Sequence, residues 1–494
     1  MKITGRGLSA ALLAGAATVA ALLLVSGDKR ADPQTPSAMP GLPPPFLGVA
    51  VLGDGGLTAA VDAYGNVVDL RAPGPAGRAL IENPAERQAA GTVATDTGIQ
   101  PWVRTGDGSE LPMWRADRIR QRYLPGTNVL RTEAWFDGAR VAITQAVHGG
   151  ELAIVVGGDA SSMQLRTSAG GNLVTKSSRV IAGAAASSRR WLSRSRPLGP
   201  AAPQWAEQVY ERSLLALRAL TDRRNGAVAA GIRDGWAYVW PRDAGAVAIA
   251  LAAAGYRPEA ELITRFMLGL GVEQFARFNG DGSPVPDREG QGDEIGWVAA
   301  AAEAAGLGSA RQTAEILSET YPVPWRERDD YWESGPGDFL ANAIASGETE
   351  ERIQGEFGTP HGLAREAGGD GGLDSAAAWA VRPFPRPSLY EPVRRTLLRL
   401  SAGAGPYGLL PGEGWKGGED PWSAPTAWSA WSLAALGERD AALQLMHALR
   451  RSATPAGDLP ERADARTGTP RSTTPLAWSH AFAVLALREL WPSR

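Results

Sequence analysis

Acidic and aromatic side chains gather in five short segments of the sequence, and each segment combines tryptophan with charged residues. Carboxylates and arginine bind hydroxyl groups, and indole rings stack on the C–H faces of sugars. This combination favours carbohydrate binding. Packing between helices is the simpler explanation for any single tryptophan, because the chain has 17 of them. The segments are residues 233–243, 290–297, 329–335, 411–428 and 457–480.

Helices must position these segments, because the sequence after Ala202 has a helical pattern. Apolar residues recur at spacings of three and four, as in QWAEQVYERSLLALRALT. Many such stretches end in glycine, which commonly follows a helix C-terminus. Long and short loops alternate between them. This pattern fits a double ring of helices whose long loops gather at one end and form a site.

The preceding region favours strands. LGVAVLG, LTAAVDAYGNVVDL and ELAIVVGG carry β-branched residues between glycine and aspartate turns, and AYGNVVDL is typical of a hairpin. We therefore expect an antiparallel β-sandwich at residues 46–175. A linker rich in serine and arginine is expected at 176–203, and the helical domain at 204–494.

The N-terminus has the features of an export signal. Lys2 and Arg6 precede an almost unbroken apolar run at residues 8–25. The run is also just long enough to span a bilayer, so residues 1–27 are either a cleaved signal peptide or a membrane anchor. A proline-rich tether follows at 28–45. We expect an exported protein, either secreted or anchored to the outer face of the cytoplasmic membrane.

The composition argues against several classes of chemistry. The 494 residues include no cysteine, which excludes disulfides, thiolate catalysis and cysteine-bound metals. The four histidines lack metal-ligand spacing, so we expect no histidine metal site. A formal net charge of −3 argues against a nucleic-acid partner. No dinucleotide fingerprint or phosphate loop follows a predicted strand.

Four motifs follow one another along the helical region. They are YVWPRDA at 238–244, YWES at 331–334, GGEDPWSAPTAW at 417–428 and LPERADARTGTPRSTTPLAWSHA at 459–481. In this order they resemble the signatures of glycoside hydrolase family 15, which contains glucoamylase, glucodextranase and bacterial trehalases. The resemblance covers about residues 205–492. The β region is similar, more weakly, to the family's N-terminal sandwich.

The resemblance implies a mainly α fold, an (α/α)6 barrel preceded by a small antiparallel β-sandwich. It also implies an exo-acting hydrolase that releases glucose from the non-reducing end of α-glucosides with inversion. Glu333 matches the general acid and Glu461 the general base. His480 is expected to be structural and to bond the loop that carries Glu461.

The resemblance also implies a pocket for the non-reducing sugar. Arg242 and Asp243 match the pair that holds its hydroxyls, and Trp240 matches an aromatic wall. The full set of expected substrate-binding residues is Trp240, Arg242, Asp243, Gln291, Asp293, Trp332 and Trp422.

Each of these residues has a simpler explanation. Glu333 lies in an acidic stretch that could be exposed surface, and Glu461 could be an ordinary loop charge. Arg242 and Asp243 could form a structural ion pair at a helix N-terminus, where aspartate is favoured. The order of the four motifs favours the catalytic interpretation.

Two positions depart from the family pattern. Ser334 stands where the family often has a second acidic residue, and Leu409-Leu410 stand where Arg-Tyr or Arg-Phe is common. Both positions serve the sugar on the leaving side in relatives. Specificity for maltose-like leaving groups is therefore in doubt, and the linkage (α-1,4, α-1,6 or α,α-1,1) stays open.

Three other functions stay open as well. A disaccharide phosphorylase on a related barrel would need no carboxylate base, so Glu461 argues against it. A sugar-binding relative without activity fits the departures at Ser334 and Leu409. A helical toroid for protein contacts would leave the acidic loops unexplained. The expected partner is an α-linked oligosaccharide or polysaccharide, and carboxylates with water require no organic cofactor.

Overall fold

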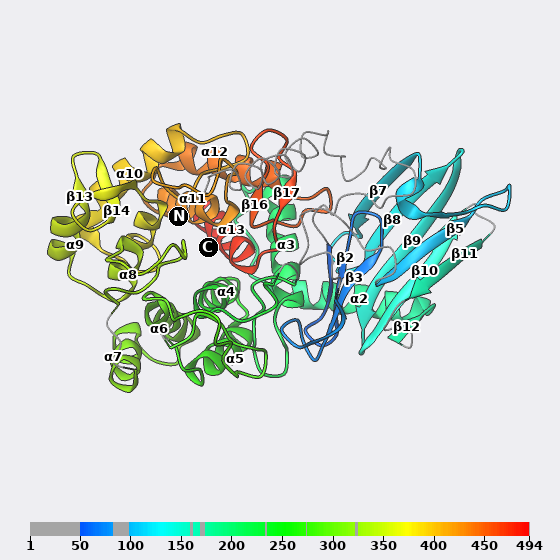
Figure 1. The fold of residues 1–494 in the computed structure, drawn as a ribbon, viewed down its shortest axis with the longest axis horizontal. Coiled ribbons are helices and arrows are strands. Elements are labelled where there is room, and N and C mark those ends of the chain that lie inside the picture. Colours follow the sequence, from blue (N-terminus) through cyan, green and yellow to red (C-terminus); the bar gives the residue numbers. More distant parts are fainter. Residues whose placement is uncertain are drawn as a thin grey trace, which may run out of the picture.

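The computed structural model describes residues 50–82, 98–158, 162–167, 173–232, 235–272, 274–321 and 325–493. An N-terminal region of two sheets lies beside a larger helical body (Figure 1). The predicted order, antiparallel strands first and helices afterwards, is confirmed. The predicted signal or anchor at 1–27 and the tether at 28–45 lie outside the described residues.

Two sheets form the N-terminal region. One has the order β1-β2-β3-β5-β11, with β4 beside β3 and β6 beside β5; the other has the order β12-β10-β9-β8-β7. The predicted hairpin is confirmed between β2 and β3, where the Asp62 amide donates to the Asn66 carbonyl and Gly65 has a φ of 82°. The strands of the first sheet are β1 (Ala50–Gly53), β2 (Thr58–Val61), β3 (Val67–Ala72), β4 (Arg78–Glu82), β5 (Ile99–Arg104), β6 (Glu110–Pro112) and β11 (Ser162–Thr167). Those of the second are β7 (Arg118–Tyr123), β8 (Leu130–Phe136), β9 (Ala139–His148), β10 (Glu151–Gly158) and β12 (Val174–Thr175).

The segment 176–203, predicted as a linker, contains the helix α2 (Ser178–Leu192). Its buried residues Val180, Ala184 and Trp191 recur at helical spacing, and Ala184 packs against Ala146 of β9. Strand β9 is therefore covered on both faces, by the other sheet and by α2. The serine and arginine residues that suggested a linker lie largely on the outer side of this amphipathic helix.

The helical body has inner and outer helices. The inner helices α4 (Pro241–Ala253), α6 (Glu294–Ala305), α11 (Ser423–Ala435) and α13 (Ala477–Leu490) are rich in alanine and buried along most of their length. A helix that is apolar on all sides belongs in a core. The outer helices bury one face, as α12 (Arg439–Ser452) does with Leu445, Met446 and Leu449. The remaining helices are α3 (Gln204–Ala219), α5 (Arg257–Leu268), α7 (Ala310–Thr320), α8 (Leu340–Ala345), α9 (Glu350–Phe357) and α10 (Tyr390–Ala402).

Contacts among the inner elements run from one to the next and return to the first. Helix α4 packs against α6, α6 against α8, and α8 against the 3-10 helix η4 (Ser375–Ala380). The η4 helix packs against α11, α11 against α13, and α13 against α4. The core of this body also includes Val51 and Ala60, so the first sheet packs against it directly.

Short strands stabilise the loops at the ends of the inner helices. A three-stranded sheet contains β13 (Gly358–Thr359), β14 (Gly362–Glu366) and β15 (Asp370–Leu373). A separate pair is formed by β16 (Arg462–Ala463) and β17 (Pro470–Arg471). Of the helices in the described part of the chain, none is both long enough and apolar enough to cross a membrane.

Candidate active site

A cavity of about 380 Å³ opens where the inner helices begin. Trp240, Trp422 and Leu476 each precede the first residue of an inner helix, and all three line the cavity. The backbone N–H groups of a helix N-terminus attract electron-rich ligands. The full lining is Trp236, Trp240, Arg242, Asp243, Arg288, Tyr331, Trp332, Glu333, Trp415, Trp422, Glu461, Arg462, Ser472, Leu476 and Trp478.

Most residues singled out in the sequence meet at this cavity. Both candidate catalytic carboxylates, Glu333 and Glu461, line it although they lie far apart in the sequence. Gln291 and Asp293 do not line it but bond a residue that does, Arg242. The predicted binding residues on the cavity wall are Trp240, Arg242, Asp243, Trp332 and Trp422.

Arg242 is the centre of a buried polar cluster at the cavity wall. Its Nη1 donates to Gln291 Oε1 at 2.7 Å and to the two Asp293 carboxylate oxygens at 3.0 and 2.9 Å. Only 4% of the Arg242 side chain is exposed. Burial opposes its charge, but Asp293 and Asp243 outweigh burial and raise the pKa of the guanidinium. The arginine is thus a fixed cation in the wall of the cavity.

Asp243 lies beside Arg242 on the first turn of α4. Burial raises the pKa of its carboxyl to about 7; Arg242 acts in the opposite direction, and the charges of Glu461, Asp293 and Glu333 add to the rise. A carboxyl that titrates near neutral pH in a cavity is typical of a functional site. It can accept a hydroxyl hydrogen bond when ionised and donate one when protonated.

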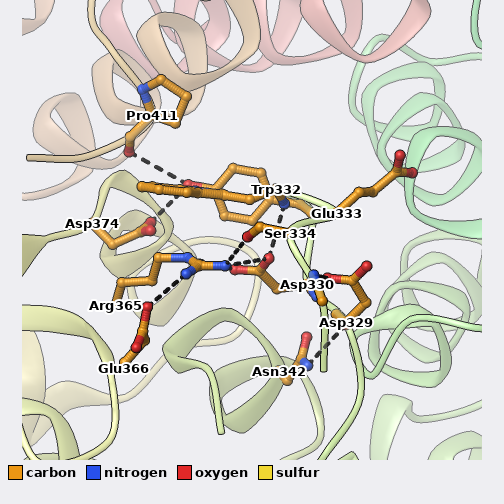
Figure 2. A network of polar contacts seen from close by, with 12 residues as sticks. Asp329, Asp330, Trp332, Glu333, Ser334, Asn342, Arg365, Glu366, Asp374 and Pro411 are labelled. Carbon is orange, nitrogen blue, oxygen red and sulfur yellow. Dashed lines mark hydrogen bonds and ion pairs between the residues drawn. The ribbon is translucent and has the colours of Figure 1, made fainter. Parts of the chain in front are cut away.

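Glu333 lies in a tight loop between α7 and α8, which we call the Glu333 loop (residues 329–335). The Glu333 amide donates to the Asp330 carbonyl at 3.0 Å, and Glu333 has a φ of 52°. Such a left-handed conformation is uncommon for a residue other than glycine. The side chain is 27% exposed and points away from the polar contacts that hold the loop (Figure 2).

Within the described part of the chain, two residues bond the Glu333 carboxylate. Arg288 forms an ion pair with it, and Gln291 Nε2 donates to Glu333 Oε1 at 3.1 Å. The Arg288 guanidinium also lies about 6.0 Å from the ring centre of Trp240. Arg288 was not among the expected site residues, since it lies two residues before the nearest polar segment and belongs to no motif.

Glu461 lies in a second loop, which we call the Glu461 loop (residues 457–464), and only 5% of the residue is exposed. Its amide donates to the Thr473 carbonyl at 2.9 Å, and its carbonyl accepts from the Ser423 amide at 3.0 Å. The His480 ring accepts from the Leu459 amide through Nε2 at 3.0 Å. The prediction that His480 bonds this loop is therefore confirmed.

His480 is neutral, because burial lowers its pKa well below the usual value, with Arg212 adding to the effect. Since Nε2 accepts from Leu459, the ring proton lies on Nδ1, which donates to Ser213 Oγ at 2.9 Å. The Glu461 loop is thereby joined to α3.

The Glu461 loop also contacts the sheet region. Tyr123 of β7 donates to Asp458 Oδ2 at 2.8 Å, and its hydroxyl accepts from the Val51 amide, also at 2.8 Å. Arg212 forms an ion pair with Asp458 at 3.2 Å and lies over the Tyr123 ring at 3.9 Å. The same arginine donates to Asn128 Oδ1 at 2.6 Å. One loop of the cavity is therefore bonded to both parts of the molecule.

Four indole N–H groups of the cavity wall are buried and have no hydrogen-bond partner in the described part of the chain. Buried polar groups are normally paired. The four residues are Trp332, Trp415, Trp422 and Trp478.

The two departures from the family pattern have different environments. Ser334 lines a neighbouring cavity of about 670 Å³, which shares Trp332 and Trp415 with the first. Leu409 is buried, and its carbonyl accepts from the Trp422 amide at 2.7 Å. Leu409 is thus a packing residue that supports a wall of the cavity.

Comparison with solved structures identifies the fold. A crystal structure of a bacterial glucoamylase complexed with acarbose matches 93% of this chain and 97% of its own, with a TM-score of 0.65 and 13% identity. A glycosidase matches 61% of this chain and 98% of its own, with a TM-score of 0.50 and 19% identity. A glycosidase variant in complex with glucose has the same coverage, with a TM-score of 0.50 and 18% identity. No protein-family model and no curated protein sequence matches the chain. The structural neighbours that the motifs led us to expect, a glucoamylase and glycosidases, thus share the fold of this chain.

Proposed function

We propose that the chain is an exo-acting glycoside hydrolase that releases glucose from the non-reducing end of α-glucosides with inversion. One observation carries the proposal: Glu333 and Glu461 line a single cavity together with Arg242, Asp243 and a tryptophan wall. The two carboxylates come from separate loops, as two opposed catalytic groups require. The fold of glucoamylase supports the same assignment.

In the proposed reaction, the protonated carboxyl of Glu333 gives its proton to the glycosidic oxygen as the bond from that oxygen to the anomeric carbon breaks. The Glu461 carboxylate takes a proton from a water molecule, whose oxygen bonds the anomeric carbon from the opposite face. The leaving sugar departs as an alcohol. Glu333 ends ionised and Glu461 protonated, and exchange with solvent restores both.

The ion pair between Arg288 and Glu333 has to open for this reaction. A proton donor must be a carboxylic acid, and an arginine keeps its own proton in proteins. A sugar that enters the cavity reaches both groups, because both line it. Substrate hydroxyls would then replace the carboxylate as partners of Arg288.

Exo action is proposed because Arg242 and Asp243, which match the pair that holds the hydroxyls of the terminal sugar in the resembled family, both line the cavity. Arg242 is held in place by a buried ion pair with Asp293, and the two side chains are 4% and 0% exposed. The buried Arg242 and the titrating Asp243 are proposed to bind the hydroxyls of this terminal sugar.

The helical body is proposed to be an (α/α)6 barrel. The inner contacts that run from α4 through α6, α8, η4, α11 and α13 back to α4 support a ring of six. The outer helices, each buried on one face, would form the second ring. Two inner positions are short, since α8 has six residues and η4 is a 3-10 helix.

The protein is further proposed to act outside the cytoplasmic membrane, where an α-glucan would be its substrate. The basic and apolar N-terminal sequence supports this location. Sequencing the N-terminus of the mature protein, together with fractionation of the cells, distinguishes a secreted from an anchored form.

Release of glucose tests the proposed activity. The purified protein is incubated with maltose, isomaltose, trehalose and a short dextrin, and glucose is measured over time. We expect release from at least one of these substrates, and the fastest one identifies the linkage. No release from any of them over days would contradict the proposal.

A sugar-binding protein without activity is the second candidate. The ion pair of Arg288 with Glu333 favours it, because it occupies the group that should donate the proton. Calorimetric titration with acarbose, the ligand of the glucoamylase neighbour, would then give binding in a protein that releases no glucose.

A further inference from the structure

Arg365 of β14 lies beside the Glu333 loop without touching Glu333 itself. Its side chain is 7% exposed. The guanidinium packs against two aromatic rings, 4.2 Å from the ring centre of Trp332 and 4.1 Å from that of Phe339. These contacts and the burial of the side chain restrict the orientation of the planar group.

The N–H groups of Arg365 bond the loop on both sides of Glu333. Nε and Nη2 donate to the two Asp330 carboxylate oxygens at 3.1 and 2.9 Å. Nη2 also donates to Ser334 Oγ at 2.7 Å, and Nη1 donates to Glu366 at 2.8 Å. Figure 2 shows these contacts on one side of the loop and the Glu333 side chain on the other.

Asp330, which Arg365 holds, bonds the backbone on the N-terminal side of Glu333 and at Glu333 itself. Its Oδ1 accepts from the Trp332 amide at 3.0 Å, and its carbonyl accepts from the Glu333 amide at 3.0 Å. Glu333 sits in the left-handed conformation that this turn imposes. Such a conformation persists only where the surroundings hold it, and Arg365 with Asp330 forms a rigid, bidentate part of those surroundings.

We propose that Arg365 is a positioning residue for proton donation: it holds the Glu333 loop so that the Glu333 carboxyl reaches the glycosidic oxygen. The inference rests on the proposed hydrolase function. Lysine could replace the charge of Arg365 but not its planar fork, which bonds Asp330 and Ser334 at once. The fork, and not the charge alone, positions the acid.

Leaving groups of different basicity separate this role from a purely structural one. A sugar leaving group needs a proton, whereas fluoride does not. We compare R365M and R365K with the wild type on the fastest of the three disaccharides and on α-glucosyl fluoride. We expect kcat on the disaccharide to fall about 10²-fold, the scale of general acid catalysis, and kcat on the fluoride to stay within a few-fold.

Two further variants bracket the effect. E333Q removes the proposed acid and should give the same selective loss. R326M is the matched control, because Arg326 is also stacked on a tryptophan and paired with two carboxylates, Asp338 and Glu356, but does not bond the Glu333 loop. We expect R326M to affect both substrates alike.

An equal loss on both substrates in R365K would overturn the role of Arg365, whatever the folding of R365M. If R365M does not fold, R365K and S334A still carry the test, since S334A removes one bond of the fork and should give a smaller selective loss. A wild type that hydrolyses neither substrate would instead refute the proposed function, and the inference with it.

Discussion

The two loops that carry the candidate carboxylates are held in different ways. The Glu333 loop is bonded within the helical body, by Arg365 of β14 and by Asn342 of α8, which donates to the Asp329 carbonyl at 3.1 Å. The Glu461 loop is bonded to the sheet region as well, through Asp458 and Tyr123. If the acid and the base lie on these two loops, the position of each therefore depends on a different set of contacts.

The carboxyls also differ in exposure. The Glu333 side chain is 27% exposed and is paired with Arg288, whereas the residue Glu461 is 5% exposed. An acid must regain its proton from solvent after each turnover, and exposure helps it to do so. A base that activates one bound water gains from a buried and fixed position. The contrast fits the two proposed roles.

The largest expected effect separates the two carboxylates themselves. E333Q and E461Q should each lower disaccharide turnover by about 10²–10⁴-fold, the range for loss of a general acid or base. On α-glucosyl fluoride we expect the same large loss of turnover for E461Q only, because attack by water still needs a base. Steady-state kinetics of both variants on both substrates measures the difference. Equal rates of E333Q and E461Q on the fluoride would remove the contrast between the loops.

The stability of the protein should depend on pH through Asp374, which bonds the Glu333 loop. Asp374 accepts from the hydroxyl of Tyr331 in the Glu333 loop at 2.7 Å, and burial raises the pKa of its carboxyl to about 7. The pKa of Asp374 is thus higher in the folded protein than the value of 3.8 expected in the unfolded chain. Its contribution to the free energy of unfolding is therefore fully present below pH 3.8 and is lost as the pH rises through 7.

D374N cannot titrate, so its stability should fall less than that of the wild type between pH 5 and pH 8, by on the order of 3 kcal/mol. Urea unfolding at both pH values measures the difference. D281N is the matched control: Asp281 is exposed and its pKa is lowered by Ser283, so it stays ionised throughout this range. Parallel pH profiles of D374N and the wild type would show that Asp374 does not titrate as described.

The smallest effect concerns the support of the Glu461 loop by the sheet region. Y123F removes the hydroxyl that joins Val51 to Asp458 and should cost about 1–3 kcal/mol in unfolding free energy. It should also lower kcat several-fold. Y256F removes another buried hydroxyl, which donates to the Trp191 carbonyl at 3.0 Å and bonds neither loop. A comparable stability loss with unchanged kcat is expected for Y256F. Unchanged kcat in Y123F as well would mean that the sheet region does not support the base.

The sequence draws attention to residues that line the cavity, but not to the contacts that hold them. Local periodicity and turn residues indicate the hairpin at Gly65 and the inner helices, because these depend on neighbours in the chain. The motifs identify Glu333, Glu461 and Arg242 by resemblance.

The missed contacts depend on tertiary packing. Arg365 bonds Asp330 across 35 positions and Tyr123 bonds Asp458 across 335, and no local pattern marks such pairs. Helix α2 was missed for a different reason: Val180, Ala184 and Trp191 recur at helical spacing, but the serine and arginine residues around them were interpreted as a linker.

The anomeric form of the first product tests the central claim most directly. The wild type is incubated with its fastest α-linked disaccharide, and newly released glucose is followed by proton NMR before mutarotation. The account predicts that β-glucose appears first, because water attacks from the face opposite the leaving group. Early appearance of α-glucose would contradict the division of roles between Glu333 and Glu461.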